Sequence, residues 1–251
     1  MTDVSHTSRK FVLVDSSVLI GYYVPEAATN TEASSRIKVL IEAIRHHRAD
    51  IHLYVPNIVI AETFCQLARL CYSKWDKQVN SKFPGTRKTL DTRKYKTACD
   101  KFRRDIHNGA LLYQYELNRY HVLALDLLAP VDKHRKFYRK KGVRSMGASD
   151  LLIGSMAMHL SRVHERASVA LLSNDRRMTA IFGKAAPKIN KNTAIDLGLL
   201  TTSKKLGFGE WGERIYPQVI DLARCRESEL IEFFGVWPLE TKKLRNRDPK
   251  A

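Results

Sequence analysis

The sequence predicts an α/β fold in three layers (α/β/α), with helices covering both faces of a central parallel sheet. Two observations lead to this prediction. Short apolar runs rich in β-branched residues alternate along the chain with longer segments of helical spacing. Acidic residues directly follow two of these runs, as expected where parallel strands end at an edge that carries a site. The chain has 251 residues, 44% of them hydrophobic, which is enough for a substantial core.

Each expected element follows from a local pattern. The predicted strands are the apolar runs 11–14, 52–55, 121–125 and 168–172. The predicted helices cover residues 33–47, 58–72, 110–119, 148–160, 215–224 and 227–234. Asn57 is a suitable N-cap for the second of these helices. The helix that begins at Ala148 is apolar on almost every side, so we expect it to be buried, with the small Gly154 allowing close packing.

Two stretches lie outside the expected core. We predict a core domain over residues 10–195 with a basic helical insertion at about 74–118, followed by a helical extension with a basic tail over 196–251. The first part of the insertion is rich in cations and contains interleaved aromatic residues. The cations are Lys74, Lys77, Lys82, Arg87, Lys88, Arg93, Lys94, Lys96, Lys101, Arg103 and Arg104.

The composition restricts the class of protein. There are 43 Lys+Arg against 26 Asp+Glu, a formal net charge of +17, which favours a polyanionic partner such as nucleic acid. A solvated basic surface without that role is the alternative. Four cysteines with no C-x-x-C pair argue against a disulfide scaffold or a cysteine zinc site and predict a cytoplasmic protein. No apolar run approaches the roughly 20 residues that span a bilayer, so no membrane partner is expected.

Four carboxylates stand out by position. Asp15 and Asp175 each follow a predicted strand, whereas Glu62 and Asp150 lie in the first turns of their helices. Parallel strands bring such positions to one edge of the sheet. Like charges gathered there repel one another unless a cation joins them, and Mg²⁺ prefers oxygen ligands of this kind. Such an ion could activate water for attack on a phosphodiester. For a single Asp after a strand, a role in a turn is the more ordinary interpretation.

Four segments in chain order resemble the motifs of PIN-domain nucleases, the family that includes the VapC-type toxins of toxin–antitoxin pairs. They are residues 12–20, 55–62, 148–157 and 171–178. The resemblance implies a PIN-like fold and a metal-dependent endoribonuclease that uses Mg²⁺ or Mn²⁺. It implies that the catalytic and metal-binding acids are Asp15, Glu62, Asp150 and Asp175. The positions expected to orient ligands or waters are Ser16, Ser17, Ser173 and Asn174. RNA is the implied substrate, and an antitoxin or other protein and a second copy of the chain are the implied partners.

The basic side chains are expected to contact RNA phosphates. The candidates are Lys88, Arg93, Lys94, Arg103, Arg104, Arg135, Arg139, Lys140 and Arg144. Aromatic residues among the cations would stack on unpaired bases or pack the insertion onto the core. Two other functions stay open from the sequence. One is a non-catalytic RNA-binding module of the same fold, and the other is a structure-specific DNA nuclease.

Overall fold

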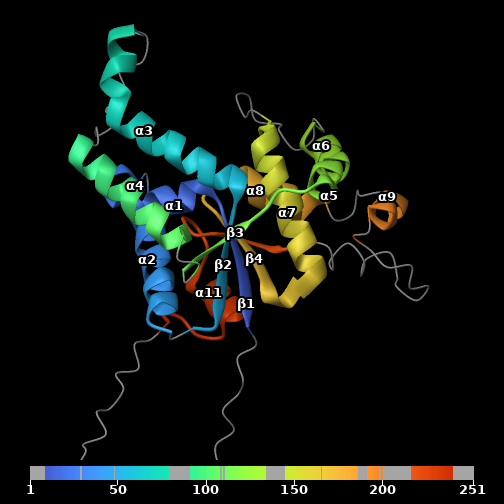
Figure 1. Ribbon diagram of the computed structural model, residues 1–251. Helices are drawn as coiled ribbons and strands as arrows, with labels where there is room; N and C mark the ends of the chain where they lie inside the picture. Colours follow the sequence, from blue (N-terminus) through green and yellow to red (C-terminus); the bar gives the residue numbers. More distant parts are fainter. Residues whose placement is uncertain are drawn as a thin grey trace, which may run out of the picture.

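The computed structural model describes most of the chain, and the prediction of an α/β fold with a central parallel sheet is confirmed. The described residues are 9–28, 30–47, 49–79, 91–107, 109, 111–133, 145–164, 166–185, 191–197, 199 and 216–239. In this part of the chain five parallel strands form one sheet in the order β3-β2-β1-β4-β5 (Figure 1). They are β1 (Lys10–Val14), β2 (Ile51–Pro56), β3 (Leu112–Tyr115), β4 (Val169–Ser173) and β5 (Gln218–Asp221).

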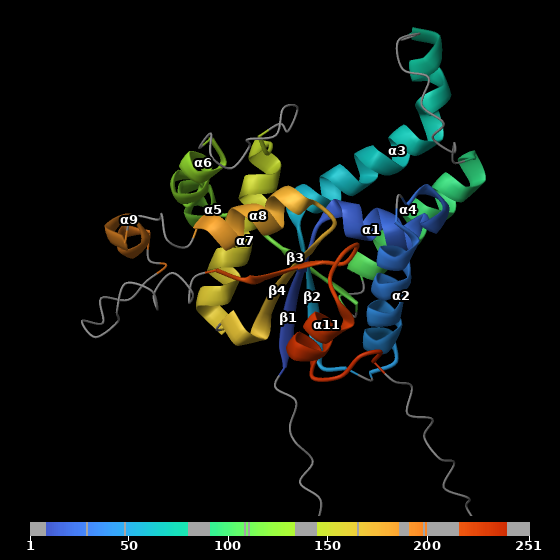
Figure 2. The same cartoon turned by 180° about the vertical axis from the view of Figure 1, so that it is seen from behind.

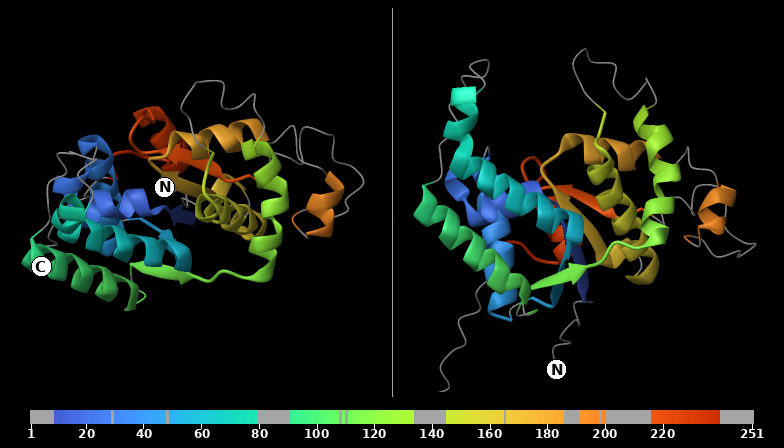
Figure 3. Two further views of the ribbon diagram at one scale, coloured as in Figure 1. Left: turned by 90° about the horizontal axis from the view of Figure 1, so that it is seen from above. Right: turned by 45° about the horizontal axis from the view of Figure 1, so that its top comes forward.

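Helices cover both faces of the sheet, and Figure 3 shows the two helical layers from above. The first layer contains α1 (Ser16–Tyr23), η1 (Pro25–Ala27), α2 (Thr31–Arg45), α3 (Asn57–Val79) and α4 (Thr92–His107). The second layer contains α5 (Arg119–Leu123), α6 (Leu125–Lys133), α7 (Ala148–His164), η2 (Arg166–Ser168) and α8 (Arg176–Ala185). The remaining described helices are α9 (Lys191–Asp196) and α11 (Glu227–Phe234).

The strand order places a switch point between β1 and β4. These strands are neighbours, yet the helices that follow them, α1 and α8, lie on opposite faces of the sheet. A crevice therefore opens beyond their carboxyl ends, which is where α/β proteins bind ligands. Both strands are central and buried on both faces, because every residue of β4 is buried and the last three residues of β1 have no exposed surface.

Helix α7 is buried as its composition predicts. It packs against α6 and β4, and ten of its residues are buried. A Cβ atom built on Gly154 would lie 3.0 Å from the Phe182 ring and 3.2 Å from Leu128. The expected close packing at Gly154 is therefore confirmed, and it fixes the helix whose first turn carries Asp150.

Three predicted elements are wrong. Residues 121–125 form helical structure in α5 and the start of α6, because Asn118 caps α5 and the His121 ring reciprocates by accepting from the Asn118 N–H. The third strand is instead β3, within the segment 110–119 that we expected to be helical. The segment 215–224 contains β5 rather than a helix. Both misassigned strands are four residues long and lie at sheet edges, where an alternating pattern is too short to be decisive.

The expected insertion and extension each supply an edge strand. Strand β3 lies within 74–118, and β5 lies beyond residue 196, so the sheet draws on both stretches. The division into two domains at 195 stays a prediction. Arg36 of α2 donates to the carbonyl oxygens of Leu222 and Cys225, which ties the segment before α11 to the first layer (Figure 2). None of the described helices is both long and apolar enough to cross a membrane.

Candidate active site at the carboxyl ends of β1 and β4

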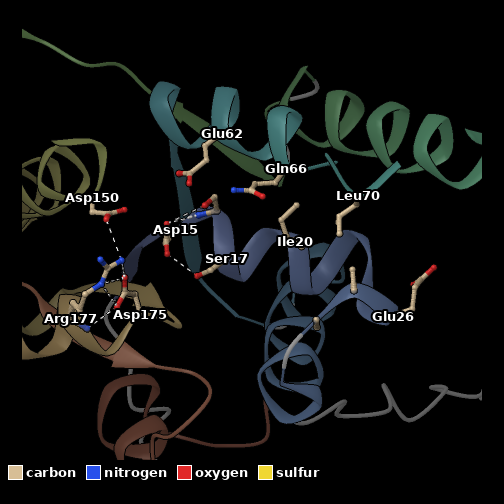
Figure 4. A pocket seen from close by; sticks show the side chains of 13 residues that line it. Asp15, Ser17, Ile20, Glu26, Glu62, Gln66, Leu70, Asp150, Asp175 and Arg177 are labelled. Atoms are coloured by element: carbon tan, nitrogen blue, oxygen red, sulfur yellow. Dashed lines mark hydrogen bonds and ion pairs between the residues drawn. The ribbon is translucent and has the colours of Figure 1, made fainter. Parts of the chain in front are cut away.

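The four acids singled out in the sequence line one pocket. Its volume is about 690 Å³, and it lies beyond the carboxyl ends of β1 and β4. Figure 4 shows Asp15, Glu62, Asp150 and Asp175 around one end of it, with Glu26 at the other. The complete lining consists of Asp15, Ser16, Ser17, Ile20, Glu26, Ala27, Ala28, Glu62, Gln66, Leu70, Asp150, Asp175 and Arg177. Four separate elements of the fold thus deliver one carboxylate each to a shared space.

Asp15 is the most deeply buried of the four acids and is held by several donors. It is only 7% exposed and is the N-cap of α1, where one carboxylate oxygen accepts from the Ser16 N–H at 2.7 Å. The other oxygen accepts from Ser17 Oγ at 2.7 Å and from Ser173 Oγ at 3.0 Å. Burial raises the pKa of Asp15, and these hydrogen bonds act in the opposite direction. The bonds therefore fix the orientation of a carboxylate that burial alone would tend to protonate.

The two loop residues after β4 complete this network. Ser173 Oγ donates to Asp15 and accepts from the Asp175 N–H at 3.0 Å, so one hydroxyl links two of the acids. The Asn174 side-chain amide donates to the Ser17 carbonyl oxygen at 3.3 Å, and the Asn174 N–H donates to Ser17 Oγ at the same distance. The four polar residues expected beside the acids, Ser16, Ser17, Ser173 and Asn174, thus lie around Asp15.

Glu62 faces Asp15 from the opposite wall of the pocket. It lies in the second turn of α3, and its pKa is raised by burial and further by the nearby carboxylates of Asp15 and Asp150. A hydrogen bond from the Ser16 side chain lowers it. The Oε2 atom of Glu62 is buried and has no hydrogen-bond partner. A buried acceptor without a donor is costly and uncommon, so this oxygen is a candidate ligand for a cation.

Arg177 lies between the other two acids. Its Nε atom donates to Asp175 Oδ2 at 2.9 Å, and its Nη2 atom lies 3.6 Å from Asp150 Oδ2. Asp150 also accepts from the Gly147 N–H at 3.2 Å in the first turn of α7. Burial raises the pKa of Asp150, while the Gly147 hydrogen bond and the Arg177 charge act against this rise. The guanidinium therefore neutralises the side of the pocket formed by Asp150 and Asp175.

The donor chemistry of the pocket fits a hard divalent cation. All the candidate ligands are oxygens, burial raises the pKa of three of the four acids, and one carboxylate oxygen of Glu62 has no donor. The potential ligands lie farther apart than those of a metal site with a bound ion. Among the described residues, no three His, Cys, Asp or Glu side chains lie close enough together to hold an ion as they stand. Asp15 and Glu62 form the part of the pocket without a cationic side chain between them (Figure 4).

The rest of the pocket forms a groove between two helices. Glu62, Gln66 and Leu70 recur every four residues on α3 and face Ile20 of α1 across the space (Figure 4). Eight helical residues span about 12 Å, which is longer than a single phosphate group. The groove ends at η1, where Glu26 pairs with Lys94 of α4 at 3.3 Å. Its walls change from acidic to mixed apolar and amide along this length.

Four of the nine predicted RNA-contacting cations fall within the described residues. All four are on α4 and are exposed: Arg93, Lys94, Arg103 and Arg104. Lys94 reaches the far end of the acidic pocket through Glu26, whereas Arg103 pairs with Asp100 at 2.6 Å and lines a different pocket between α3, α4 and β3. The other candidates, Lys88, Arg135, Arg139, Lys140 and Arg144, lie outside the described residues.

Of the pocket residues that the sequence did not single out, Arg177 and Gln66 carry polar side chains next to the acids. Arg177 follows Asp175 by two positions, and the pair Arg176-Arg177 directly after an acid-bearing strand is the signal that could have identified it. Gln66 lies one helical turn after Glu62 and therefore on the same face, a relation that helical periodicity makes available.

Comparison with known proteins does not assign the chain to a family. No protein-family model matches it, and no curated protein matches it. One solved structure with a likeness to it is that of VapBC2 from Rickettsia felis bound to a DNA fragment from its promoter. The TM-score is 0.38 at 13% sequence identity, over 68% of this chain and 92% of that one. The resemblance to PIN-domain nucleases thus depends on the motifs and on the positions of their residues.

Proposed function

We propose that this protein is a metal-dependent endoribonuclease that hydrolyses RNA phosphodiester bonds. The observation that carries the proposal is the convergence of Asp15, Glu62, Asp150 and Asp175 on one pocket from four separate elements. A purely structural role would not require four carboxylates to face the same space, because like charges close together repel one another. The net charge of +17 supports a polyanionic substrate.

The residues divide into holding and orienting roles. Asp15 and Glu62 would hold Mg²⁺ or Mn²⁺ directly, with Asp150 and Asp175 as further ligands or as acceptors for bound water. The ion would supply a Lewis acid and would lower the pKa of a water molecule. Ser17 and Ser173 fix the Asp15 carboxylate through their hydrogen bonds. The groove along Gln66 and Leu70 would receive the adjoining part of the RNA strand.

The direct test is cleavage of labelled RNA by the purified full chain with Mg²⁺, Mn²⁺ or a chelator. Wild type is expected to cut RNA only with a divalent ion, and Asp15→Asn and Glu62→Gln to lose cleavage. Glu26→Gln is the matched control, because Glu26 lines the far end of the same pocket and pairs with Lys94. Branched DNA is digested in parallel. Cleavage that survives Asp15→Asn and the chelator would refute the proposal. Cleavage of the DNA but not of the RNA would mean that the substrate is DNA.

One observation favours a second candidate, a non-catalytic RNA-binding module. Arg177 already satisfies Asp150 and Asp175, and no three potential ligands are close together in the described part of the chain. In this alternative the acids stabilise the loop after β4 and no ion is needed. It predicts RNA binding that divalent ions do not affect and no cleavage of any RNA tested. An antitoxin-type partner, a homodimer and a cytoplasmic location stay predictions.

A further inference from the structure

A row of aromatic side chains crosses the sheet on the side of the second helical layer. We define the aromatic face as Phe11 of β1, His52 and Tyr54 of β2, and Tyr113 and Tyr115 of β3. The strand register pairs Phe11 with His52 and Tyr54 with Tyr113, so these side chains point to the same side of the sheet. The opposite side at this edge carries Leu112 and Gln114, against which α3 and α4 pack.

The rings of the aromatic face lie close to one another. The His52 and Tyr113 rings are stacked with centroids 4.8 Å apart and planes inclined by 12°. Tyr54 lies 6.0 Å from Tyr113 and 5.6 Å from Tyr115 between ring centroids. Phe11 lies 6.4 Å from Tyr54 and is stacked on its other side with His164 of α7. Neighbouring rings are therefore close enough for one ligand to contact more than one of them.

The aromatic face is only partly covered. Helix α7 packs over β4 and β1 on this side, whereas the described helices that pack extensively on β2 and β3 lie on the opposite side (Figure 1). All five side chains remain partly exposed. The exposed side chains of Tyr120 and Val163, 44% and 67% accessible, lie on α5 and α7 in the same layer. Aromatic residues in the core of a sheet would ordinarily be covered by a helix, so this exposure needs an explanation.

One cation lies beside the aromatic face, and two more lie on helices of the same layer. Arg9 precedes β1 and pairs with Asp50 at 2.9 Å. Its charge lowers the pKa values of both His52 and Tyr54. Arg119 lies with its guanidinium 4.8 Å from the Tyr120 ring centroid. Arg162 lies in the last turn of α7, and its charge lowers the pKa values of Tyr120 and His159. Burial chiefly lowers the pKa values of His52 and His164, which favours the neutral form of both rings.

We propose that the aromatic face is a binding surface on which a single-stranded nucleic acid stacks its unpaired bases. Proteins that bind single strands combine stacked aromatic rings with cations that follow the phosphate backbone, and a sheet with exposed rings is one established form of such a surface. The composition of this face favours a nucleic acid over a protein partner. Its rings are mainly Tyr and His, which have polar edges, and the cationic Arg9, paired with Asp50, lies beside His52 and Tyr54.

The surface is distinct from the acidic pocket but shares one end of the sheet with it. Tyr115 is the last residue of β3 and pairs in register with Pro56, the last residue of β2. Asp15 directly follows β1 at this same carboxyl edge. A strand stacked on the aromatic face would therefore approach the pocket from the side of β3. Binding at this face does not require the pocket to hold a metal ion.

The test measures binding of a fluorescein-labelled oligo(A) RNA of about 12 nucleotides to the full chain by anisotropy, with chelator present. Tyr54→Leu and Tyr113→Leu are expected to weaken binding by about fivefold or more each, since stacking on a ring contributes substantially per base. Tyr54→Phe and Tyr113→Phe keep the rings and are expected to bind within about twofold of wild type. The same RNA annealed into a duplex is expected to bind more weakly, because its bases are already stacked.

A reporter variant makes the result independent of lost stability. In Tyr113→Trp the new indole is expected to be quenched by the single strand beyond any change in the wild type, which contains Trp75, Trp211 and Trp237. The assay contains chelator and does not measure cleavage, so failure of the nuclease proposal would not affect this result. Unchanged affinity in folded Tyr54→Leu and Tyr113→Leu, or no quenching in Tyr113→Trp, would overturn the proposal. Concentration-dependent self-association lost in the Leu variants, with RNA binding retained, would identify a protein interface instead.

Discussion

The acidic pocket and the aromatic face belong to the same sheet but obtain their stability differently. In the pocket, buried carboxylates are kept in place by serine hydroxyls, backbone N–H groups and Arg177. On the aromatic face, neutral rings pack on one another and leave their outer surfaces partly exposed. The stability of the pocket therefore depends on the protonation of its acids and on nearby cations. The stability of the aromatic face depends on the contact area between its rings. This difference separates a candidate site for chemistry from a candidate site for binding.

The largest expected effect concerns the pocket. Asp150→Asn should reduce metal-dependent RNA cleavage by at least about a thousandfold, because it removes one of the acids that would hold the ion. Since the pKa of Asp150 is raised, the folded state binds its proton more readily than the unfolded state does, so the charged group costs stability at neutral pH. The variant should thus melt no lower than wild type in chelator. An inactive variant that is also unfolded would not support the assignment.

The second effect is a pH dependence of the free energy of unfolding, which arises from a histidine beside the aromatic face. His121 is 1% exposed and contacts Tyr115, and burial lowers its pKa from 6.5 to about 4. The unfolded chain binds this proton more readily, so stability is full above about pH 6.5 and falls as the pH drops towards 4, by up to about 3 kcal/mol. Chemical unfolding at several pH values measures the slope. His121→Gln should flatten it between these limits, and an unchanged slope would contradict the assignment to His121.

The third effect concerns the support of Asp15. Ser173→Ala removes a donor to the buried carboxylate and an acceptor for the Asp175 N–H, at an expected cost of about 2 kcal/mol in the free energy of unfolding. Ser161→Ala is the matched control, because Ser161 is equally buried but bonds only to the Ala157 carbonyl oxygen of its own helix. Its cost should be smaller. Equal costs for the two variants would mean that Ser173 has no special relation to the acids.

The smallest effect separates the two candidate functions of the pocket. Arg177→Gln removes the cation between Asp150 and Asp175, so their carboxylates become available to a divalent ion. The affinity for Mn²⁺, measured without RNA, should rise by about tenfold. A lower or unchanged affinity would indicate that Arg177 does not compete with a metal ion, and would favour the structural role of the acids.

The central part of the fold could be predicted because its sequence signals are strong. The runs that form β1, β2 and β4 are mainly apolar, with β4 buried throughout and β1 and β2 buried over much of their length, and each is a strand in the structure. Once those strands are placed, Asp15 and Asp175 follow at the same edge. The edge strands β3 and β5 were missed because four residues with polar neighbours do not define a period.

The site was partly predictable for a related reason. Positions next to strands and helix starts identify the acids, since topology alone brings them to one edge. The role of Arg177 depends on a side-chain conformation that points back to Asp150 of another helix, and no sequence spacing encodes that contact. The sequence also does not predict the aromatic face, because its rings lie on three strands and the segment that contains β3 has a pattern that predicts a helix.

The most direct measurement is a calorimetric titration of the full chain with Mn²⁺ at neutral pH, without nucleic acid. The account predicts saturable binding in wild type and in Glu26→Gln, with loss of that binding in Asp15→Asn and Glu62→Gln. Equal heats in all four proteins, or no binding in folded wild type, would contradict the claim that these carboxylates form a divalent cation site.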